Sequence, residues 1–391
     1  MLSGCRPEAG SPSSSSNNPS PENANSDRGD PFDNYLKTEI APADGFDFPI
    51  GDPGVGDSAS ESAIGKTHNG WRVITRYTEK NSLGIQTGED WKNVGGGESD
   101  LAQDAVAIAN GRVVFAEDCG GSWGNVVILE HLFYENHERR KIRSLYARLH
   151  SLKVRKGEEL KKRQPVGAVA KATSNSDFHF ELRWDEALPP TYWPSSDGKD
   201  EKWVRAKYAE PSSFIAGRRR LFAPQMERSL VLVDQERYKM RFYKNGRVKS
   251  EYDISLGQAQ GQKTAQGDNK TPKGMYFVID KRRGKFDGPY GDYYGGHWIK
   301  LNYPNKYDAE RGSLAGEITR RQAEQITIRW EKRDPTLENT RLGGGIGFHG
   351  WAREWSNDGP RRLSWGCVVF HLSDIGEVFN QISQGDMVVI F

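Results

Sequence analysis

The stretch "SLVLVDQERYKMRFYKNGRVKSEYDISLG", residues 229–257, has the pattern of antiparallel β-strands. Apolar and polar residues alternate in it, which is the period of a strand with one buried face. Asn245 and Gly246 interrupt the alternation, and Asn-Gly is a common pair in two-residue hairpin turns. We therefore predict a β-meander here, with further strands in "GDNKTPKGMYFVI" (267–279) and "QGDMVVIF" (384–391).

Outside this meander, the segment "HLSDIGEVFNQIS", residues 371–383, predicts one helix that packs on the sheet. Its apolar residues recur at helical spacing, and Ser373 is a candidate cap. Nearer the N-terminus, short apolar runs such as "RVVFA" (112–116) and "NVVILEH" (125–131) are separated by glycine turns, which again indicates antiparallel strands. The expected fold class is mainly β.

Composition limits the function. The chain has 391 residues, 43 glycines and 11 tryptophans, which suits two or three β-rich domains. Its 55 Lys and Arg nearly cancel its 53 Asp and Glu, so no strong field attracts nucleic acid and we expect no such partner. No apolar run approaches the roughly 18 residues that span a bilayer. Three cysteines cannot form a disulfide framework.

The first residues, 1–33, are rich in Ser, Pro, Asn and Gly, and we predict a disordered tether. Within them "LSGC" (2–5) resembles a bacterial lipobox, which would make Cys5 the lipidated first residue of a mature lipoprotein. The alternative is a tail cysteine that matches by chance. Beyond the tether we predict domains at 34–216 and 227–391, with a linker at 217–226.

The N-terminal domain contains "QTGEDW" (86–91), "YARL" (146–149) and "DFHFELRW" (177–184). These motifs, in this order, resemble the lysostaphin-like or LytM-type zinc endopeptidases, which cut peptidoglycan crosslinks. The resemblance implies a lysostaphin-like β-sheet domain. It also implies a zinc site with three protein ligands and an open position for water.

That metal site is altered in this sequence. The family's first ligand position holds Gln86, while Asp90 and His179 remain, and two further family histidines fall on Arg148 and Asp177. A glutamine is a poor zinc ligand and an arginine cannot act as a base. We therefore predict a degenerate domain that holds no metal. Its expected role is to bind peptidoglycan or to regulate a partner cell-wall enzyme. A different metal site of Asp177, Asp90 and His179, or a mere spacer, remains an alternative.

The C-terminal domain contains "GFHGW" (347–351) and "SWGC" (364–367), together with "LGQ" (256–258) and "LNYPNKYDAERG" (301–312). These motifs resemble the YkuD-type L,D-transpeptidases, which are cysteine-dependent peptidoglycan enzymes. The resemblance implies a β-sandwich with a short helix after the catalytic cysteine. "SWGCVVF" looks more like the YafK-type subgroup, some of whose members are hydrolases.

The chemistry of these motifs supports the same interpretation. A thiol with a pKa of about 8.5 needs a base or a cation beside it to attack as a thiolate, and His349 would supply the base for Cys367. Gly366 allows a sharp turn, and N–H groups around Gly366 and Cys367 could hold an oxyanion. By resemblance, the carbonyl of Gly350 orients the imidazole, and Ser364 braces the loop. A buried structural cysteine is the alternative.

Two residues depart from the common family pattern: Trp365 replaces a histidine and Val369 replaces an arginine or asparagine. Aromatic and basic residues in the segment 282–305 and at position 365 suggest a substrate groove, in which we expect Trp365, Tyr303 and Asn305 to contact the substrate.

Together the motifs predict a cysteine L,D-transpeptidase that needs no cofactor and acts on diaminopimelate-containing stem peptides. The alternatives are a hydrolase, either an L,D-carboxypeptidase or an enzyme that releases wall-bound protein, and a non-catalytic peptidoglycan-binding scaffold. We expect a periplasmic protein that lipidated Cys5 anchors to the outer membrane.

Overall fold

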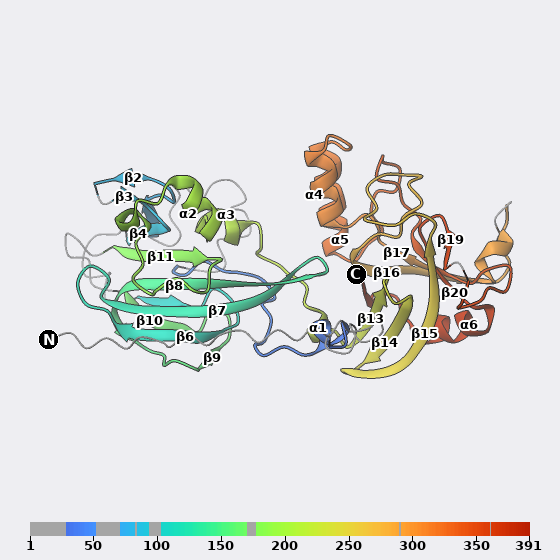
Figure 1. Ribbon diagram of the computed structural model, residues 1–391, viewed down its shortest axis with the longest axis horizontal. Coiled ribbons are helices and arrows are strands. Elements are labelled where there is room, and N and C mark those ends of the chain that lie inside the picture. The colour runs from blue at the N-terminus through green and yellow to red at the C-terminus, as the bar shows by residue number, and fades with distance from the viewer. Residues whose placement is uncertain are drawn as a thin grey trace, which may run out of the picture.

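The computed structural model describes residues 29–51, 71–82, 84–93, 103–169, 177–288, 291–359 and 361–391. Cys5 and most of the expected tether lie outside these residues. Within the described residues, no helix combines the length and the apolar character that a membrane crossing requires. The mainly β class is confirmed, since two large sheets account for the two halves of the chain (Figure 1).

The N-terminal half is built on one antiparallel sheet with the strand order β1-β4-β11-β8-β7-β6-β9. Its elements are α1 (Asp33–Leu36), β1 (Trp71–Thr75), β2 (Lys80–Asn81), β3 (Gly84–Ile85), β4 (Glu89–Asn93), β5 (Asp104–Val106), β6 (Gly111–Asp118), β7 (Asn125–Glu135), β8 (Glu138–Leu152), β9 (Glu159–Leu160), β10 (Pro165–Val169), β11 (Phe178–Arg183), η4 (Pro194–Asp197), α2 (Glu201–Lys207), β12 (Tyr208–Ala209) and α3 (Pro211–Ala216). Aromatic and aliphatic side chains, among them Trp91, Phe133 and Phe214, form its core.

The C-terminal half is a second sheet with the strand order β14-β13-β21-β16-β17-β18-β20-β15-β19. Its elements are η5 (Pro224–Met226), β13 (Ser229–Asp234), β14 (Lys239–Lys244), β15 (Arg247–Gly257), β16 (Gly274–Arg283), η6 (Gly291–Tyr294), β17 (His297–Leu301), α4 (Lys306–Leu314), α5 (Arg320–Glu331), β18 (Gly347–His349), β19 (Arg362–Ser364), β20 (Val368–Phe370), α6 (Leu372–Gln381) and β21 (Met387–Ile390).

This sheet closes on itself. β14 pairs with β15 as well as with β13, so the ladder returns to its starting strand, and the β-sandwich that we expected has the closed pairing of a barrel. The predicted meander is confirmed as β13, β14 and β15. This closure pairs β14 on both of its sides, so β14 is not left as an unpaired edge strand.

The helices differ in part from the sequence-based expectation. The expected helix is α6, but it begins after His371, and the Ser373 hydroxyl donates to Asp374 instead of capping the helix. Helices α4 and α5 were not predicted. Their signal is a capping box at each N-terminus, formed by Asn305 and by Thr319.

The hairpin of β7 and β8 extends from the N-terminal sheet to the C-terminal barrel (Figure 1). At its tip the side-chain oxygen of Asn136 accepts hydrogen bonds from the Met275 N–H (2.9 Å) and the Asn305 side chain (2.8 Å). A shared apolar cluster joins the halves, and includes Tyr134 of the hairpin with Phe222 and Trp330. Phe222 lies in the expected linker 217–226, which is therefore partly buried.

Candidate active site

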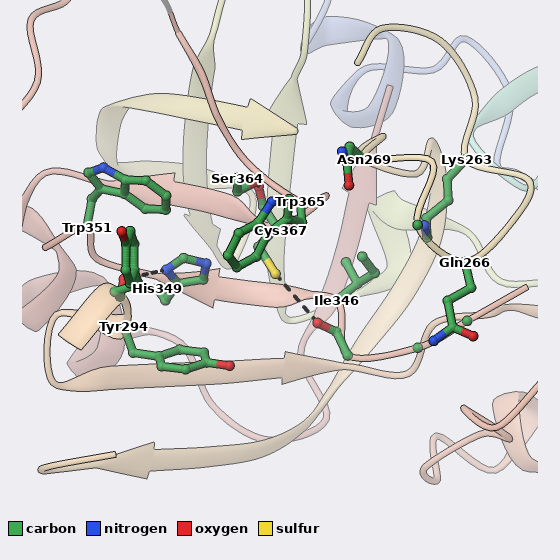
Figure 2. Close-up of a pocket in the computed structure, with 15 residues that line it drawn as sticks. Lys263, Gln266, Asn269, Tyr294, Ile346, His349, Trp351, Ser364, Trp365 and Cys367 are labelled. Carbon is green, nitrogen blue, oxygen red and sulfur yellow. Dashed lines mark hydrogen bonds between the residues drawn. The ribbon is translucent and has the colours of Figure 1, made fainter. Parts of the chain in front are cut away.

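His349 ends β18, and Cys367 directly precedes β20, which is the neighbouring strand of the C-terminal sheet. β18 and β20 run parallel, and His349 pairs with Val369. Cys367 lies two residues before Val369, the partner of His349, and Figure 2 shows its side chain beside that of His349. The register therefore places the thiol and the imidazole on one wall of one cavity, which both residues line.

The hydrogen bonds of His349 determine its tautomer. Its Nδ1 lies 2.6 Å from the Gly350 carbonyl oxygen and 3.1 Å from the Tyr293 carbonyl oxygen. Carbonyl groups only accept hydrogen bonds, so Nδ1 carries the proton and Nε2 keeps its lone pair. The geometry agrees with the role that the resemblance implied for Gly350, and it leaves His349 with the lone pair that a general base needs.

Both members of the pair are uncharged at neutral pH in the resting protein. Burial lowers the pKa of His349 to about 4, although its two backbone hydrogen bonds act in the opposite direction. Burial also raises the pKa of the Cys367 thiol to about 11, and the charge of Lys263 opposes this rise. The resting site is therefore an uncharged thiol and imidazole, and His349 acts on the thiol as the base that we expected from the sequence, not as one half of a preformed ion pair.

The turn before the cysteine is held by Ser364. The Ser364 hydroxyl donates to the Cys367 carbonyl at 2.6 Å and accepts from the Gly366 N–H at 3.2 Å. Ser364 thus links the two ends of this turn. The Gly366 N–H is engaged by this serine, so our expectation that it would hold an oxyanion is wrong, and the Cys367 N–H is the remaining candidate.

Aromatic side chains surround the pair in a cavity of 380 Å³ (Figure 2). Tyr294 packs against His349 with ring centroids 5.2 Å apart, and Trp351 stacks on it at 6.3 Å. Trp365 lines the same cavity and is 52% exposed, which suits a residue that covers a bound chain. Figure 2 shows the Cys367 sulfur between His349 on one side and Lys263 with Gln266 on the other.

Lys263 is a site residue that the sequence analysis missed. It lines the cavity although it is almost fully buried, and its ammonium group donates to Asp268 at 2.7 Å and to the Ala265 carbonyl at 2.9 Å. A buried lysine normally needs such a partner. Lys263 lies four residues before Gly267, where the quoted motif begins, and a lysine in a polar loop has no distinctive pattern that could have marked it.

Two expected substrate contacts are wrong. Tyr303 and Asn305 are fully buried, and neither lines the cavity. The Tyr303 hydroxyl donates to the Leu342 carbonyl, and its ring lies beneath Lys263 at 5.8 Å. Asn305 caps α4. Their motif is therefore structural, because it supports the wall of the cavity and the start of a helix.

The altered metallopeptidase positions gather on the N-terminal sheet. His179 of β11 pairs with Asp90 of β4, and their side chains are joined by a contact of 2.6 Å at His179 Nδ1. His179 Nε2 lies 3.0 Å from Glu181, and Arg148 lies 3.4 Å from Asp90. Burial acts to lower the pKa of His179, but its two carboxylate partners outweigh it and raise the pKa.

These residues do not fit a zinc ion. Both ring nitrogens of His179 contact carboxylate oxygens, and Gln86 supplies an amide instead of an imidazole. Asp177, which we considered as a ligand, does not line the cavity that Asp90 and His179 share. Throughout the described ranges, no group of three His, Cys, Asp or Glu side chains is placed to hold a metal ion.

Comparison with known proteins agrees with both halves of this description. Residues 228–390 match the family model YkuD, the L,D-transpeptidase catalytic domain, and residues 96–190 match peptidase family M23. The lipoprotein NlpD of Yersinia enterocolitica is 34% identical over 83 residues, which are 21% of this chain and 78% of NlpD.

Two solved structures are also similar. Bd1075 of Bdellovibrio bacteriovorus is 24% identical, with a TM-score of 0.27, over 42% of this chain and 48% of its own. A mutant L,D-transpeptidase of Enterococcus faecium is 21% identical, with a TM-score of 0.27, over 44% of this chain and 53% of its own. The chain thus spans about half the length of these two structures, and the assignment rests on the family models.

The C-terminal domain is thus recognised as a YkuD-type L,D-transpeptidase catalytic domain, and the N-terminal domain as a domain of peptidase family M23. The two resemblances seen in the sequence are confirmed.

Proposed function

We propose that this protein is a peptidoglycan-modifying cysteine L,D-transpeptidase that acts on diaminopimelate-containing stem peptides. The observation that carries the proposal is the placement of Cys367 and His349 on adjacent strands of one cavity, with the unprotonated His349 nitrogen available as a base. The YkuD match supports the reaction class.

The uncharged pair assigns the proton transfer to the moment of attack. The Cys367 sulfur attacks the carbonyl carbon of the third stem residue while its proton passes to His349 Nε2. The tetrahedral oxyanion is held by the Cys367 N–H. The carbon–nitrogen bond then breaks, and the leaving amine of the fourth residue takes the proton from His349. A thioester remains on Cys367.

The second half of the reaction regenerates the thiol. An acceptor amine attacks the thioester, gives its proton to His349 and leaves as the amide, while the sulfur recovers a proton. Water in place of the amine would give a hydrolase by the same steps. The exposed Trp365 and the nearby Tyr293 flank the cavity and would cover the incoming chain, with ring centroids 6.4 Å apart.

We further propose a location in the bacterial envelope, where peptidoglycan lies. Its support is the similarity to a protein named as a lipoprotein, together with the lipobox-like "LSGC" at residues 2–5. Globomycin treatment of expressing cells, followed by metabolic labelling with a fatty acid, tests this location. Label that depends on Cys5 would support it, and unlabelled protein would contradict it.

The function is tested by mass spectrometry of diaminopimelate-type muropeptides after incubation with the full chain, beside Cys367→Ala. Crosslinked or exchanged stems that require Cys367 are the expected result. Shortened stems alone would make the enzyme a hydrolase. If neither muropeptides nor protein-linked peptidoglycan change, the protein is not the proposed enzyme, and a peptidoglycan-binding scaffold is favoured.

A further inference from the structure

A second cavity, on the N-terminal sheet, takes no part in the transfer reaction. It has a volume of 250 Å³ and occupies the place where an M23 peptidase would hold its metal. Its walls are formed by Asn81, Gln86, Asp90, Ser122, Trp123, Arg148, His179 and Trp193.

Arg148 reaches this cavity from an irregularity in β8. The pairing of β7 with β8 shifts register between Asn125 and Val127, and Arg148 takes a left-handed backbone conformation with φ of +61°. A non-glycine residue rarely takes this conformation, which persists only where the surroundings hold it. Here the Arg148 N–H donates to the Trp123 carbonyl at 2.8 Å. Such irregularities often re-aim a side chain at a functional site.

The guanidinium of Arg148 keeps donors for a ligand. It touches Asp90 at 3.4 Å, whereas the shorter contact of Asp90, at 2.6 Å, is with His179. In the described part of the chain, no other hydrogen bond or ion pair to this guanidinium is present, and the side chain is 32% exposed. A planar guanidinium with spare N–H groups matches a carboxylate in bidentate geometry.

The other charges named near this guanidinium do not favour an anion on balance. Asp90 and Asp177 oppose an incoming anion, while Lys92 lies close enough to Asp177 to favour one. Because these neighbours do not attract an anion by themselves, the specific hydrogen bonds of Arg148, rather than a general positive potential, must select the ligand.

Two indole rings form the apolar side of the cavity. Trp123 and Trp193 lie with ring centroids 6.3 Å apart in an edge-to-face arrangement, and Trp123 also packs against His179 at 5.7 Å. Ligand pockets commonly combine such apolar walls with a few polar groups, at volumes of about 300–1,000 Å³. A cavity of 250 Å³ lies below this range and suits the end of a peptide rather than a whole chain.

We propose that the M23 domain of this chain binds the C-terminal carboxylate of a peptide at Arg148, beside Trp123 and Trp193, in place of a catalytic metal. The choice of a stem peptide as the ligand rests on the proposed function. The site itself rests on the cavity and on the donors of Arg148.

The test uses 19F NMR of the full chain labelled with 5-fluorotryptophan, in a Cys367→Ala background. Single Trp→Phe variants assign the signals of Trp123 and Trp193, which report this cavity, and of Trp351 and Trp365, which report the transpeptidase cavity. The added probe is a synthetic diaminopimelate-containing stem tetrapeptide with a free C-terminal carboxylate, compared with the same peptide as its C-terminal amide.

The free acid should shift the signals of Trp123 and Trp193, and Arg148→Gln and the amide should each weaken this binding at least ten-fold. Arg148→Lys should retain part of the binding, because lysine keeps the positive charge but loses the planar pair of N–H donors. Arg155→Gln, an exposed arginine on the following turn, is the matched control and should bind like the parent. Unchanged Trp351 and Trp365 signals between variants would show that Arg148→Gln folds normally.

Equal binding by the acid and the amide, or by the parent and Arg148→Gln, would overturn the inference, as would an absence of any Trp123 or Trp193 shift. Shifts of these two signals alone, with Trp351 and Trp365 silent, would keep the inference and count against the proposed function. Stoichiometric zinc that shifts Trp123 and competes with the peptide would restore a metal site and overturn the proposal.

Discussion

At the residue scale, the neutral state of Cys367 changes how its reactivity should be tested. With a thiol pKa of about 11, only about one molecule in 10⁴ carries a thiolate at pH 7. We expect alkylation of Cys367 by iodoacetamide to be slow at pH 7 and to accelerate about ten-fold per pH unit up to about pH 10. Peptide mass spectrometry of the labelled protein measures this rate, with Cys119 as an internal reference.

The same argument predicts that His349→Gln leaves the alkylation rate at pH 7 within about two-fold of the parent, because no ion pair is lost, while it abolishes acyl transfer. A fast reaction at pH 7 that slows in His349→Gln would instead show a preformed thiolate–imidazolium pair.

Gly366 is required by both backbone conformation and space. Its φ is +133°, and a Cβ there would lie 2.8 Å from the Lys270 carbonyl oxygen. Gly385 has a positive φ of +90° but open space around it. We expect Gly366→Ala to lower the free energy of unfolding by about 2–4 kcal/mol and Gly385→Ala by about 1–2 kcal/mol. Urea unfolding measures both, and equal losses would show that the contact with Lys270 has no cost.

At the element scale, the β7–β8 hairpin of the N-terminal domain packs its tip against the C-terminal barrel. Asn136 satisfies two buried donors of the barrel half, on Met275 and Asn305. If the Asn136 side-chain oxygen is removed, the Met275 N–H and the Asn305 amide both lose their acceptor. An unsatisfied buried donor costs about 1–3 kcal/mol of stability. We expect Asn136→Ala to lower the free energy of unfolding by about 2–5 kcal/mol, as measured by urea unfolding.

Asn245→Ala is the matched control, since Asn245 also has a positive φ in a hairpin turn but is exposed. It should lose about 1 kcal/mol or less. Similar losses in the two variants would mean that the tip contact between the domains contributes nothing beyond its own turn.

At the scale of the whole molecule, buried ionisable groups make stability depend on pH. Burial lowers the pKa of His131 from 6.5 to about 4 in the folded protein. The unfolded chain therefore binds more protons below pH 6.5, and the contribution of His131 is lost as pH falls from 6.5 toward 4. Glu89 changes the stability in the opposite direction. Burial raises its pKa to about 7, so the folded protein binds more protons than the unfolded chain, and the contribution of Glu89 becomes more favourable as pH falls.

A variant isolates the histidine from these opposing groups. His131→Gln is destabilised at pH 7, and this deficit should shrink by about 2 kcal/mol at pH 5, because the parent alone loses the histidine contribution. His150→Gln, at an exposed position, is measured beside it as the control for a histidine-to-glutamine change. Urea unfolding at the two pH values decides, and a deficit that stays constant would contradict the shifted pKa of His131.

The sequence by itself determined the fold class and family of each half. The strand period, the Asn-Gly turn and the ordered motifs around His349 and Cys367 are local patterns that can be recognised from neighbouring residues alone. Only the tertiary structure decided the rest. The burial of Tyr303 and Asn305, the use of the Gly366 N–H by Ser364, and the neutral thiol depend on which groups lie nearby in space. Closure of the barrel, the hairpin that joins the domains, and the cavity beside Arg148 are set by pairings between distant segments, which no local pattern encodes.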